Sequence, residues 1–269
     1  MSSNKLLATL LLASCNQVFG NDSVGGSPNA IYDAPIDAPF KCSPIGVTPQ
    51  FSPLLHQYAV EDCTYYAQVG SDAIAVCANV TNIAPIGMPL VPALGIMPME
   101  ILPTPRLAPD GTYLVVGYLQ SSSPTASRYV RDGDGWSLAA PQPELGALAL
   151  GNIVHVAGAD RITVRFKATL TFDELVFDGS AWTQVASHPN AELGIEGGPV
   201  SMWSSSDALR MVVADAARNL YYTDRPTVDA SFRTADPLEL SGSDDMSLSD
   251  DCSRIYVTGL GSILYAQQR

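Results

Sequence analysis

The sequence predicts an all-β fold, and three features of composition and pattern lead to this prediction. Only 15% of the 269 residues are charged, whereas soluble globular chains average about a quarter. The chain also contains 21 glycines and 20 prolines, which supply many turn positions. Finally, one outline of a polar turn followed by a β-rich run recurs through most of the sequence. Together these features favour many short strands over surface helices.

The recurring outline has an Asp at a polar turn, then two or three small or polar residues, and then a β-rich run. Five segments share it: residues 58–69, 106–118, 155–167, 203–215 and 247–259. Their aspartates are Asp62, Asp110, Asp160, Asp207 and Asp251, which by subtraction lie 48, 50, 47 and 44 residues apart. A period in the forties is typical of a four-stranded propeller blade. The sequence therefore predicts a single β-propeller, most simply one with five blades.

A second strand and a large apolar residue keep the same period. The second β-rich runs are residues 73–77, 127–131, 174–178, 219–223 and 262–266. Trp136, Trp182 and Phe232 then follow their aspartates by 26, 22 and 25 residues, and Met88 follows Asp62 by 26. We expect these large side chains to pack between blades. A six-bladed ring is the alternative if residues 78–106 contain further strands.

The last repeat is too short to form a whole blade, because only 18 residues follow Asp251. Residues 37–47 resemble residues 229–240, and Phe40 stands where Phe232 stands. We therefore expect this N-terminal segment to supply the outer strand of the final blade. Such a closure joins the first and last blades and removes exposed sheet edges.

The turn-and-strand pattern resembles the TolB-type, WD-repeat-like β-propellers. The best matches are "LAPDGTYLVVGY" (107–118) and "LSDDCSRIYVTG" (248–259), although only Asp110 is followed by Gly as in the family's Ser-x-Asp-Gly turn. The resemblance covers residues 37–269. It implies a scaffold used for binding, often in the cell envelope, and it implies no catalytic residue set. Each turn aspartate is expected to hydrogen-bond its own backbone, and "DGDG" (132–135) reads as a turn because the rest of a calcium loop is missing.

The N-terminus resembles that of a bacterial lipoprotein. Residues 1–14 carry Lys5 and then a short leucine-rich run, far too short to span a membrane. The step Leu12-Ala13-Ser14-Cys15 resembles a lipobox, which implies cleavage before Cys15 and attachment of a diacylglyceryl group to its thiol. Residues 15–36 are polar and rich in Gly, Ser and Pro, so we expect a flexible tether, and residues 37–269 form the propeller domain. Asn16 favours the outer membrane of a diderm bacterium. An ordinary signal peptide and a cytoplasmic origin are the alternatives.

Four cysteines follow Cys15, and an even number in an exported domain suggests disulfides. Cys63 and Cys77 flank an expected hairpin, while Cys42 and Cys252 belong to the two chain ends of the closing blade. We favour the pairs Cys42–Cys252 and Cys63–Cys77, with Cys63–Cys252 as an alternative. A zinc site is not expected, because no C-x-x-C pair occurs.

The charge and the residue motifs favour a binding function over catalysis. A formal charge of −13 disfavours nucleic acid and anionic lipid headgroups as partners. His56, His155 and His188 form no metal-binding motif, no nucleophile elbow or phosphate loop occurs, and we expect no cofactor. We expect a membrane partner through the lipid anchor and a protein or glycan partner in the envelope. The alternative is a carbohydrate-active hydrolase with paired carboxylates at the propeller channel, drawn from acids such as Asp173, Glu174, Glu192, Glu196 and Asp215. A passive structural protein is a third class.

Overall fold

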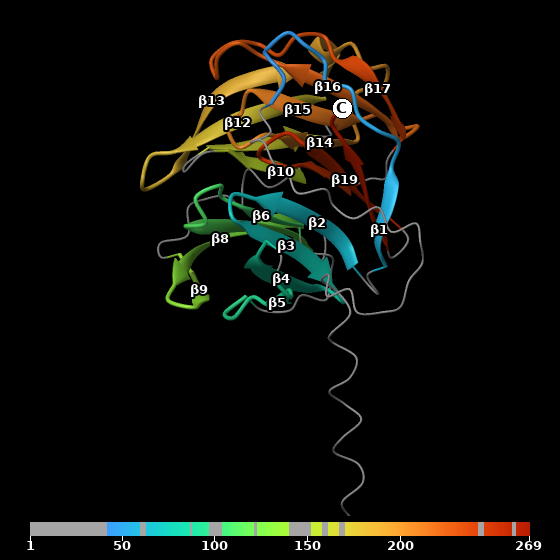
Figure 1. The fold of residues 1–269 in the computed structure, drawn as a ribbon. Helices are drawn as coiled ribbons and strands as arrows, with labels where there is room; N and C mark the ends of the chain where they lie inside the picture. The colour runs from blue at the N-terminus through green and yellow to red at the C-terminus, as the bar shows by residue number, and fades with distance from the viewer. Residues whose placement is uncertain are drawn as a thin grey trace, which may run out of the picture.

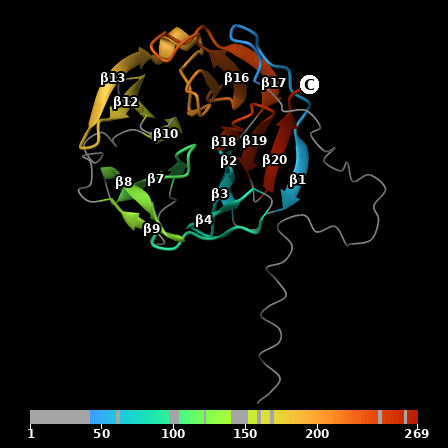
Figure 2. The same ribbon diagram turned by 60° about the vertical axis from the view of Figure 1, so that its left-hand side comes forward.

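The computed structural model describes residues 42–59, 63–86, 88–96, 104–120, 123–139, 152–157, 161–166, 170–241, 245–259 and 262–269. Over these residues the chain forms five four-stranded antiparallel sheets arranged as a ring (Figure 2). The predicted five-bladed, all-β propeller is confirmed. Residues 78–106 contribute strands only to the first two blades, so a sixth blade is not needed to place them.

Most of the strands are labelled in Figure 1. Blade 1 contains β2 (Cys63–Val69), β3 (Asp72–Cys77), β4 (Val80–Pro85) and β5 (Val91–Pro92). Blade 2 contains β6 (Thr104–Leu107), β7 (Tyr113–Gln120), β8 (Ser123–Asp132) and β9 (Gly135–Leu138). Blade 3 contains β10 (Asn152–Ala157), β11 (Arg161–Phe166), β12 (Thr171–Phe177) and β13 (Trp182–Pro189). Blade 4 contains β14 (Ser201–Ser204), β15 (Arg210–Ala214), β16 (Asn219–Asp224) and β17 (Asp236–Ser241). Blade 5 contains β18 (Asp245–Leu248), β19 (Arg254–Gly259), β20 (Ser262–Gln267) and β1 (Leu55–Ala59).

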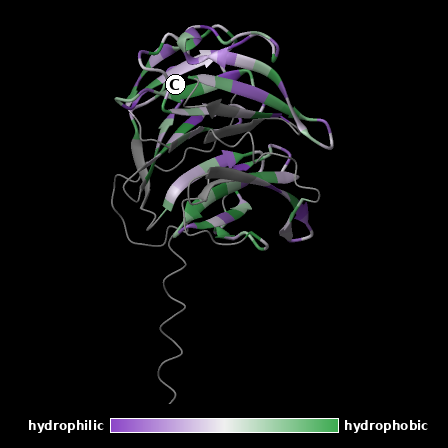
Figure 3. Cartoon of the chain, turned by 180° about the vertical axis from the view of Figure 1, so that it is seen from behind, coloured by the Kyte–Doolittle hydropathy of each residue, from purple (hydrophilic) through white to green (hydrophobic). Residues whose placement is uncertain are grey.

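Each blade begins at the centre of the ring and ends at its rim. The first strands contact one another in sequence from β6 through β10, β14 and β18 to β2, and β6 contacts β3 of blade 1. Second strands are covered on both faces, so β15 (RMVVA) is buried along its whole length. Outer strands have one exposed face, and β17 alternates between buried and exposed positions. Hydrophobic and hydrophilic residues accordingly occur within the same strands (Figure 3). The hydrophobic core therefore lies between the blades and around the central axis.

The ring is closed by an N-terminal strand, as predicted, but a different segment supplies it. β1 pairs antiparallel with β20, with Leu55 opposite Tyr265 and Ala59 opposite Ser262 (Figure 2). The expected segment 37–47 was therefore wrong: its described part, residues 42–47, precedes β1 and forms no strand. Phe40 lies outside the described residues. The outer strand begins four residues after an aromatic residue in both blades, β17 after Phe232 and β1 after Phe51, so Phe51 is the counterpart of Phe232 and the prediction chose Phe40 too early in the chain.

The first repeat was also placed one strand too early. In blades 2, 4 and 5, Asp110, Asp207 and Asp251 lie in the turn between the first and second strands. The equivalent turn of blade 1 is Gly70–Ser71, because residues 58–69 combine the end of β1 with all of β2. The run 73–77 is consequently the second strand of its blade, whereas its four counterparts lie in third strands. Asp62 and Asp160 lie outside the described residues.

Both favoured disulfides are present. Cys63 and Cys77 lie opposite each other in the β2–β3 hairpin and are bonded. Cys42 is bonded to Cys252 across 210 residues of sequence. The second bond attaches the start of the described chain to the β18–β19 turn of blade 5. It therefore lies beside the β1–β20 pairing and closes the ring a second time.

The large apolar residues of the repeats do pack between blades, with one exception. Trp182 of blade 3 packs with Tyr113 and Val115 of blade 2, and Phe232 of blade 4 packs with Phe172 of blade 3. Trp136 of blade 2 lies in the central core cluster, and its backbone N–H donates to Leu94 of blade 1. The prediction that Met88 packs between blades was wrong, since this residue is 56% exposed. The DGDG segment forms the expected turn, between β8 and β9.

The predictions for the N-terminus concern residues outside the described ranges. They concern the signal peptide 1–14, the lipidation site Cys15 and the tether 15–36. No described segment forms a helix with the length and apolar character required to span a bilayer.

Candidate functional site

The chain between Cys42 and β1 forms an extended strap, residues 43–54, along the seam between blades 4 and 5. Its first half is held by blade 4. The Gly46 N–H donates to Asp224 Oδ2 at 2.9 Å, and Arg233 Nη2 donates to Thr48 Oγ1 at 2.8 Å. Arg210 Nη2 also donates to the Ser43 carbonyl at 3.0 Å. These contacts fix a segment that has no regular secondary structure of its own.

The second half of the strap is held by the end of the chain in blade 5. The Ser52 N–H donates to the Gln267 carbonyl at 2.7 Å, and the Arg269 N–H donates to the Gln50 carbonyl at 2.9 Å. Phe51 and Gln268 form an isolated antiparallel bridge. The strap thus continues the β1–β20 pairing beyond β1, and it connects two blades through hydrogen bonds to both.

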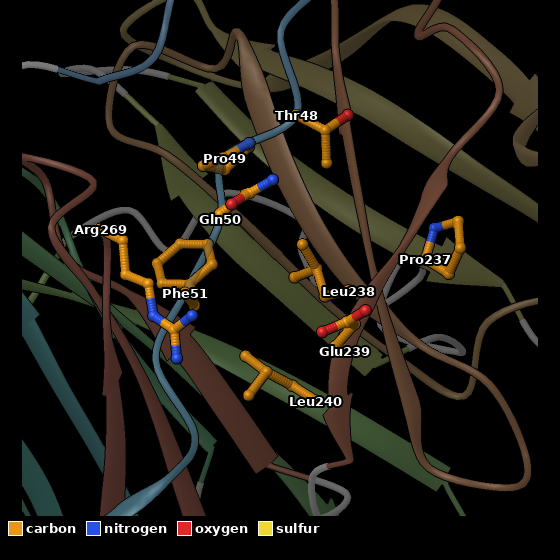
Figure 4. A pocket seen from close by; sticks show the side chains of 9 residues that line it. All are labelled: Thr48, Pro49, Gln50, Phe51, Pro237, Leu238, Glu239, Leu240 and Arg269. Carbon is orange, nitrogen blue, oxygen red and sulfur yellow. The ribbon is translucent and has the colours of Figure 1, made fainter.

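A groove with a volume of about 440 Å³ lies between the strap and the outer strand of blade 4. We call it the seam groove, and Thr48, Pro49, Gln50, Phe51, Pro237, Leu238, Glu239, Leu240 and Arg269 line it (Figure 4). The strap residues and Arg269 form one wall, and β17 forms the other. Gln50, Glu239 and Arg269 are exposed, whereas Phe51 is half-buried against the central core.

Charged groups brace one end of the seam groove. Asp224 is buried and accepts a hydrogen bond from Arg233 Nε at 2.7 Å. The same guanidinium also contacts Asp236, which accepts a second hydrogen bond from Thr48. Hydrogen bonds from Arg233 and then from Thr48 hold the pKa of Asp236 below its ordinary value. Partial burial lowers the pKa of Arg233, but its bonds to Asp236 and Asp224 outweigh this, and the net pKa is raised. Asp236 and Arg233 therefore stay charged at neutral pH.

The centre of the ring is filled by a cation between aromatic rings. The Arg106 guanidinium of blade 2 lies 4.5 Å from the ring centre of Tyr65 in blade 1 and 5.4 Å from that of Trp203 in blade 4. Blades 2 and 4 are not neighbours, so these side chains meet across the axis. All three are buried. Among the inner-strand side chains that the structure describes, none is acidic.

Four of the five acids named for the hydrolase alternative have separate partners instead of a common site. Asp173 accepts from Ser187 Oγ at 2.6 Å, and Asp215 accepts from the Asn219 N–H at 2.8 Å. Glu174 is buried and forms ion pairs with Arg161 and, at 2.7 Å, with Arg225. Glu192 lies 3.6 Å from His188 Nδ1, and Glu196 is exposed.

Histidines and turn aspartates have structural surroundings where their side chains are described. His188 is buried and stacks on Phe172 with ring centres 4.8 Å apart. Asp110 accepts from the Thr112 N–H at 3.0 Å, and Asp251 accepts from the Ser253 N–H at 2.9 Å. The expected turn-stabilising role of these aspartates is confirmed. Within the described ranges, no group of three or more His, Cys, Asp or Glu side chains could hold a metal ion.

Sequence reasoning missed the strap and the seam groove. No sequence pattern distinguishes Asp224, Arg233 and Asp236, because isolated acids and arginines occur throughout the chain. The sequence offered one hint of the strap, the stretch between Cys42 and β1. This stretch is too short for a blade, and it contains more apolar residues than a tether would. The groove residues come from three distant parts of the sequence, so no local pattern could have brought them together.

Comparisons with known proteins add a likeness of fold. No family model matches the chain, and no curated protein matches it. Among solved structures, TolB from Acinetobacter baumannii matches with a TM-score of 0.47 at 9% identity, covering 77% of this chain and 54% of that one. A functionally unknown protein from Desulfotomaculum acetoxidans matches with a TM-score of 0.45 at 13% identity, covering 77% and 66%.

A third solved structure is a proposed 6-phosphogluconolactonase from Bacteroides uniformis. It matches with a TM-score of 0.44 at 11% identity, covering 72% of this chain and 62% of that one. The chain thus spans less than two thirds of the length of each of these three structures. At such low identity the likeness concerns the fold alone, and no activity is transferred from any of the three.

Proposed function

We propose that this protein is a lipid-anchored lipoprotein of the cell envelope whose propeller is a non-catalytic binding domain. The observation that carries the proposal is the lipobox ending at Cys15, followed by a polar segment that leads directly to the strap. The leaving peptide is short and apolar, which suits an exported chain. The outer membrane of a diderm bacterium is the proposed location, and a protein or glycan of the envelope is the proposed partner.

The disulfides support export and the place of attachment. Two bridges in one domain are typical of an oxidising compartment. Cys42, the first described residue after the polar segment, is bonded to a turn of blade 5. A pull on the anchor would therefore reach the propeller through a covalent bond, before it reached the hydrogen bonds of the strap.

The interior of the ring supports binding over catalysis. A propeller hydrolase requires two carboxylates at a fixed separation around an open channel. Here Tyr65, Arg106 and Trp203 fill the axis, and the candidate acids are engaged elsewhere. The seam groove offers instead a preformed concave surface on the rim.

Membrane fractionation tests the anchor. Each acyl methylene that enters the bilayer contributes about 0.8 kcal/mol, so two or three chains hold a protein firmly. Wild type should remain with membranes after a high-salt wash, and Cys15→Ala should not. Ser14→Ala, which keeps a small residue before the cysteine, is the matched control and should behave as wild type. If Cys15→Ala still sediments with washed membranes, the anchor is wrong.

A further inference from the structure

We propose that the seam groove binds a short neutral oligosaccharide, a ligand class that rests on the binding role proposed above. The groove combines a half-buried aromatic ring with three exposed planar polar side chains in one concave site. Its volume of about 440 Å³ lies in the range of small-ligand sites, roughly 300 to 1,000 Å³.

The walls of the groove are already in place without a ligand. The strap is tied at one end by Thr48 to Asp236 and Arg233, and at the other by the pairing of Phe51 with Gln268. The opposite wall, β17, is paired with β16. A ligand would therefore need to order few groups on binding, which favours affinity for a small molecule.

The polar side chains match the hydrogen-bonding of sugar hydroxyls. Gln50 carries an amide that donates and accepts, the Glu239 carboxylate accepts, and the Arg269 guanidinium donates. Within the described residues, none of these three side chains is hydrogen-bonded or ion-paired to another side chain. A sugar hydroxyl both donates and accepts, so neighbouring hydroxyls can satisfy all three groups.

Phe51 supplies the apolar complement. Its ring is half-buried against the central cluster and also lines the groove. The C–H face of a sugar ring is apolar and can pack against such a ring, whose face is electron-rich. Packing against the core also holds the Phe51 side chain in one place.

Charge and strand chemistry argue for a neutral sugar over an anion or a peptide strand. The exposed charges of Glu239 and Arg269 balance each other, and the chain as a whole carries −13. An extended peptide would have to pair with the free edge of β17. Pro237 has no N–H to offer there, and the charged Glu239 is a residue type that discourages edge pairing.

The test is a titration of the purified full chain in detergent with maltose, cellobiose and chitobiose, followed by amide NMR shifts. We expect at least one of these disaccharides to bind and to shift the amides of residues 48–51 and 238–240. Gln50→Ala should weaken that binding about tenfold, because it removes a hydrogen-bonding group worth roughly 1.4 kcal/mol. Glu239→Gln should weaken it to a similar extent, because it removes the negative charge and replaces one accepting oxygen with an NH2 group that only donates. Phe51→Ala should abolish it, and Phe51→Tyr should retain it.

Glu196→Gln is the matched control, since Glu196 is also exposed but lies outside the groove. It should bind like wild type. The proposal is overturned if none of the three disaccharides shifts the groove amides, or if Glu239→Gln and Glu196→Gln bind alike. Capture of an envelope protein that is lost in Glu239→Gln would likewise exclude the sugar, while leaving the binding role intact. The fractionation of Cys15→Ala is independent of all these outcomes.

Discussion

Cys42 and Cys252 are joined by a disulfide, with their Cα atoms 4.8 Å apart, although 210 residues separate them in sequence. Cys252 lies in the β18–β19 turn, and Cys42 immediately precedes the strap that leads to β1. The β1–β20 ladder and this bond therefore close the same blade from two sides. One closure consists of hydrogen bonds and the other is covalent.

Removing the ring-closing disulfide should destabilise the protein more than removing the hairpin disulfide. In the chain-entropy model, opening a loop of this length costs about 5 kcal/mol of unfolding free energy, whereas opening the 14-residue loop of Cys63–Cys77 costs roughly 3 kcal/mol. Urea unfolding of Cys42→Ser/Cys252→Ser and of Cys63→Ser/Cys77→Ser, without reductant, measures both. The loop-closure argument fails if the hairpin variant has the lower midpoint.

The contact between Asp224 and the strap should matter for stability and for the order of the strap. Asp224→Ala removes the partner of Arg233 Nε and the acceptor of the Gly46 N–H. Because Arg233 is only partly buried and keeps its contact with Asp236, this loss costs about 2 kcal/mol. We expect that loss in urea, together with faster hydrogen exchange at Gly46.

Asp134→Ala, in the exposed β8–β9 turn, is the control and should leave both readouts unchanged. Unaltered exchange at Gly46 in Asp224→Ala would show that blade 4 does not hold the strap.

Glu174→Gln should strongly lower the free energy of unfolding, although the two side chains have nearly the same size. Glu174 and Arg225 are each 1% exposed, and burial lowers the pKa of Arg225, although Glu174 opposes this. Without the carboxylate, the buried Arg225 guanidinium loses its ion pair and keeps only the weaker electrostatic attraction of Asp229, at a cost of about 3 kcal/mol. Asp173→Asn, the adjacent residue on the other face of β12, should cost under about 1 kcal/mol. Equal unfolding midpoints for the two variants would contradict this assignment.

Asp250 and Asp251 should respond to pH in opposite directions. Burial raises the pKa of Asp250 above its ordinary value of 3.8, although the Gly70 N–H opposes this. Burial also raises the pKa of Asp251, but hydrogen bonds from Ser249 and Ser253 outweigh it, and the net pKa lies below 3.8. The folded state thus gains stability as Asp250 takes up a proton and loses stability as Asp251 does.

Relative to wild type, Asp250→Asn should be stabilised at pH 7, and this advantage should disappear as the pH falls through the raised pKa toward 3.8. Asp251→Asn should be destabilised at pH 7, and this deficit should disappear only below pH 3.8. Urea midpoints between pH 7 and pH 3 measure both differences. If the two differences carry the same sign at pH 7, the environments assigned to these carboxylates are wrong.

The periodic features of the fold were predictable because they repeat. Turn aspartates such as Asp110 and Asp251 recur at a blade's length, and Trp182 and Phe232 recur as inter-blade packing residues, so five weak signals reinforce one another. Cys63 and Cys77 were predictable because a hairpin places them directly opposite. The ring had to close because the last repeat holds only two strands after Asp251.

The features that occur once could not be predicted in the same way. Nothing local distinguishes β1 from the strap before it, and the register of β1 depends on its pairing with β20. The seam groove depends on Phe51, Glu239 and Arg269 meeting in space, although some 190 residues separate the first two in sequence. The bracing by Arg233 also depends on the path of the strap, which the ring as a whole determines.

The central claim is that this propeller is held to a membrane through Cys15. Mass spectrometry of the N-terminal peptide of the mature protein tests it most directly. We predict a chain that begins at Cys15 and carries the mass of a diacylglyceryl group, while Cys15→Ala retains residues 1–14. A mature chain that begins at another residue, or that carries an unmodified Cys15 thiol, would contradict the account.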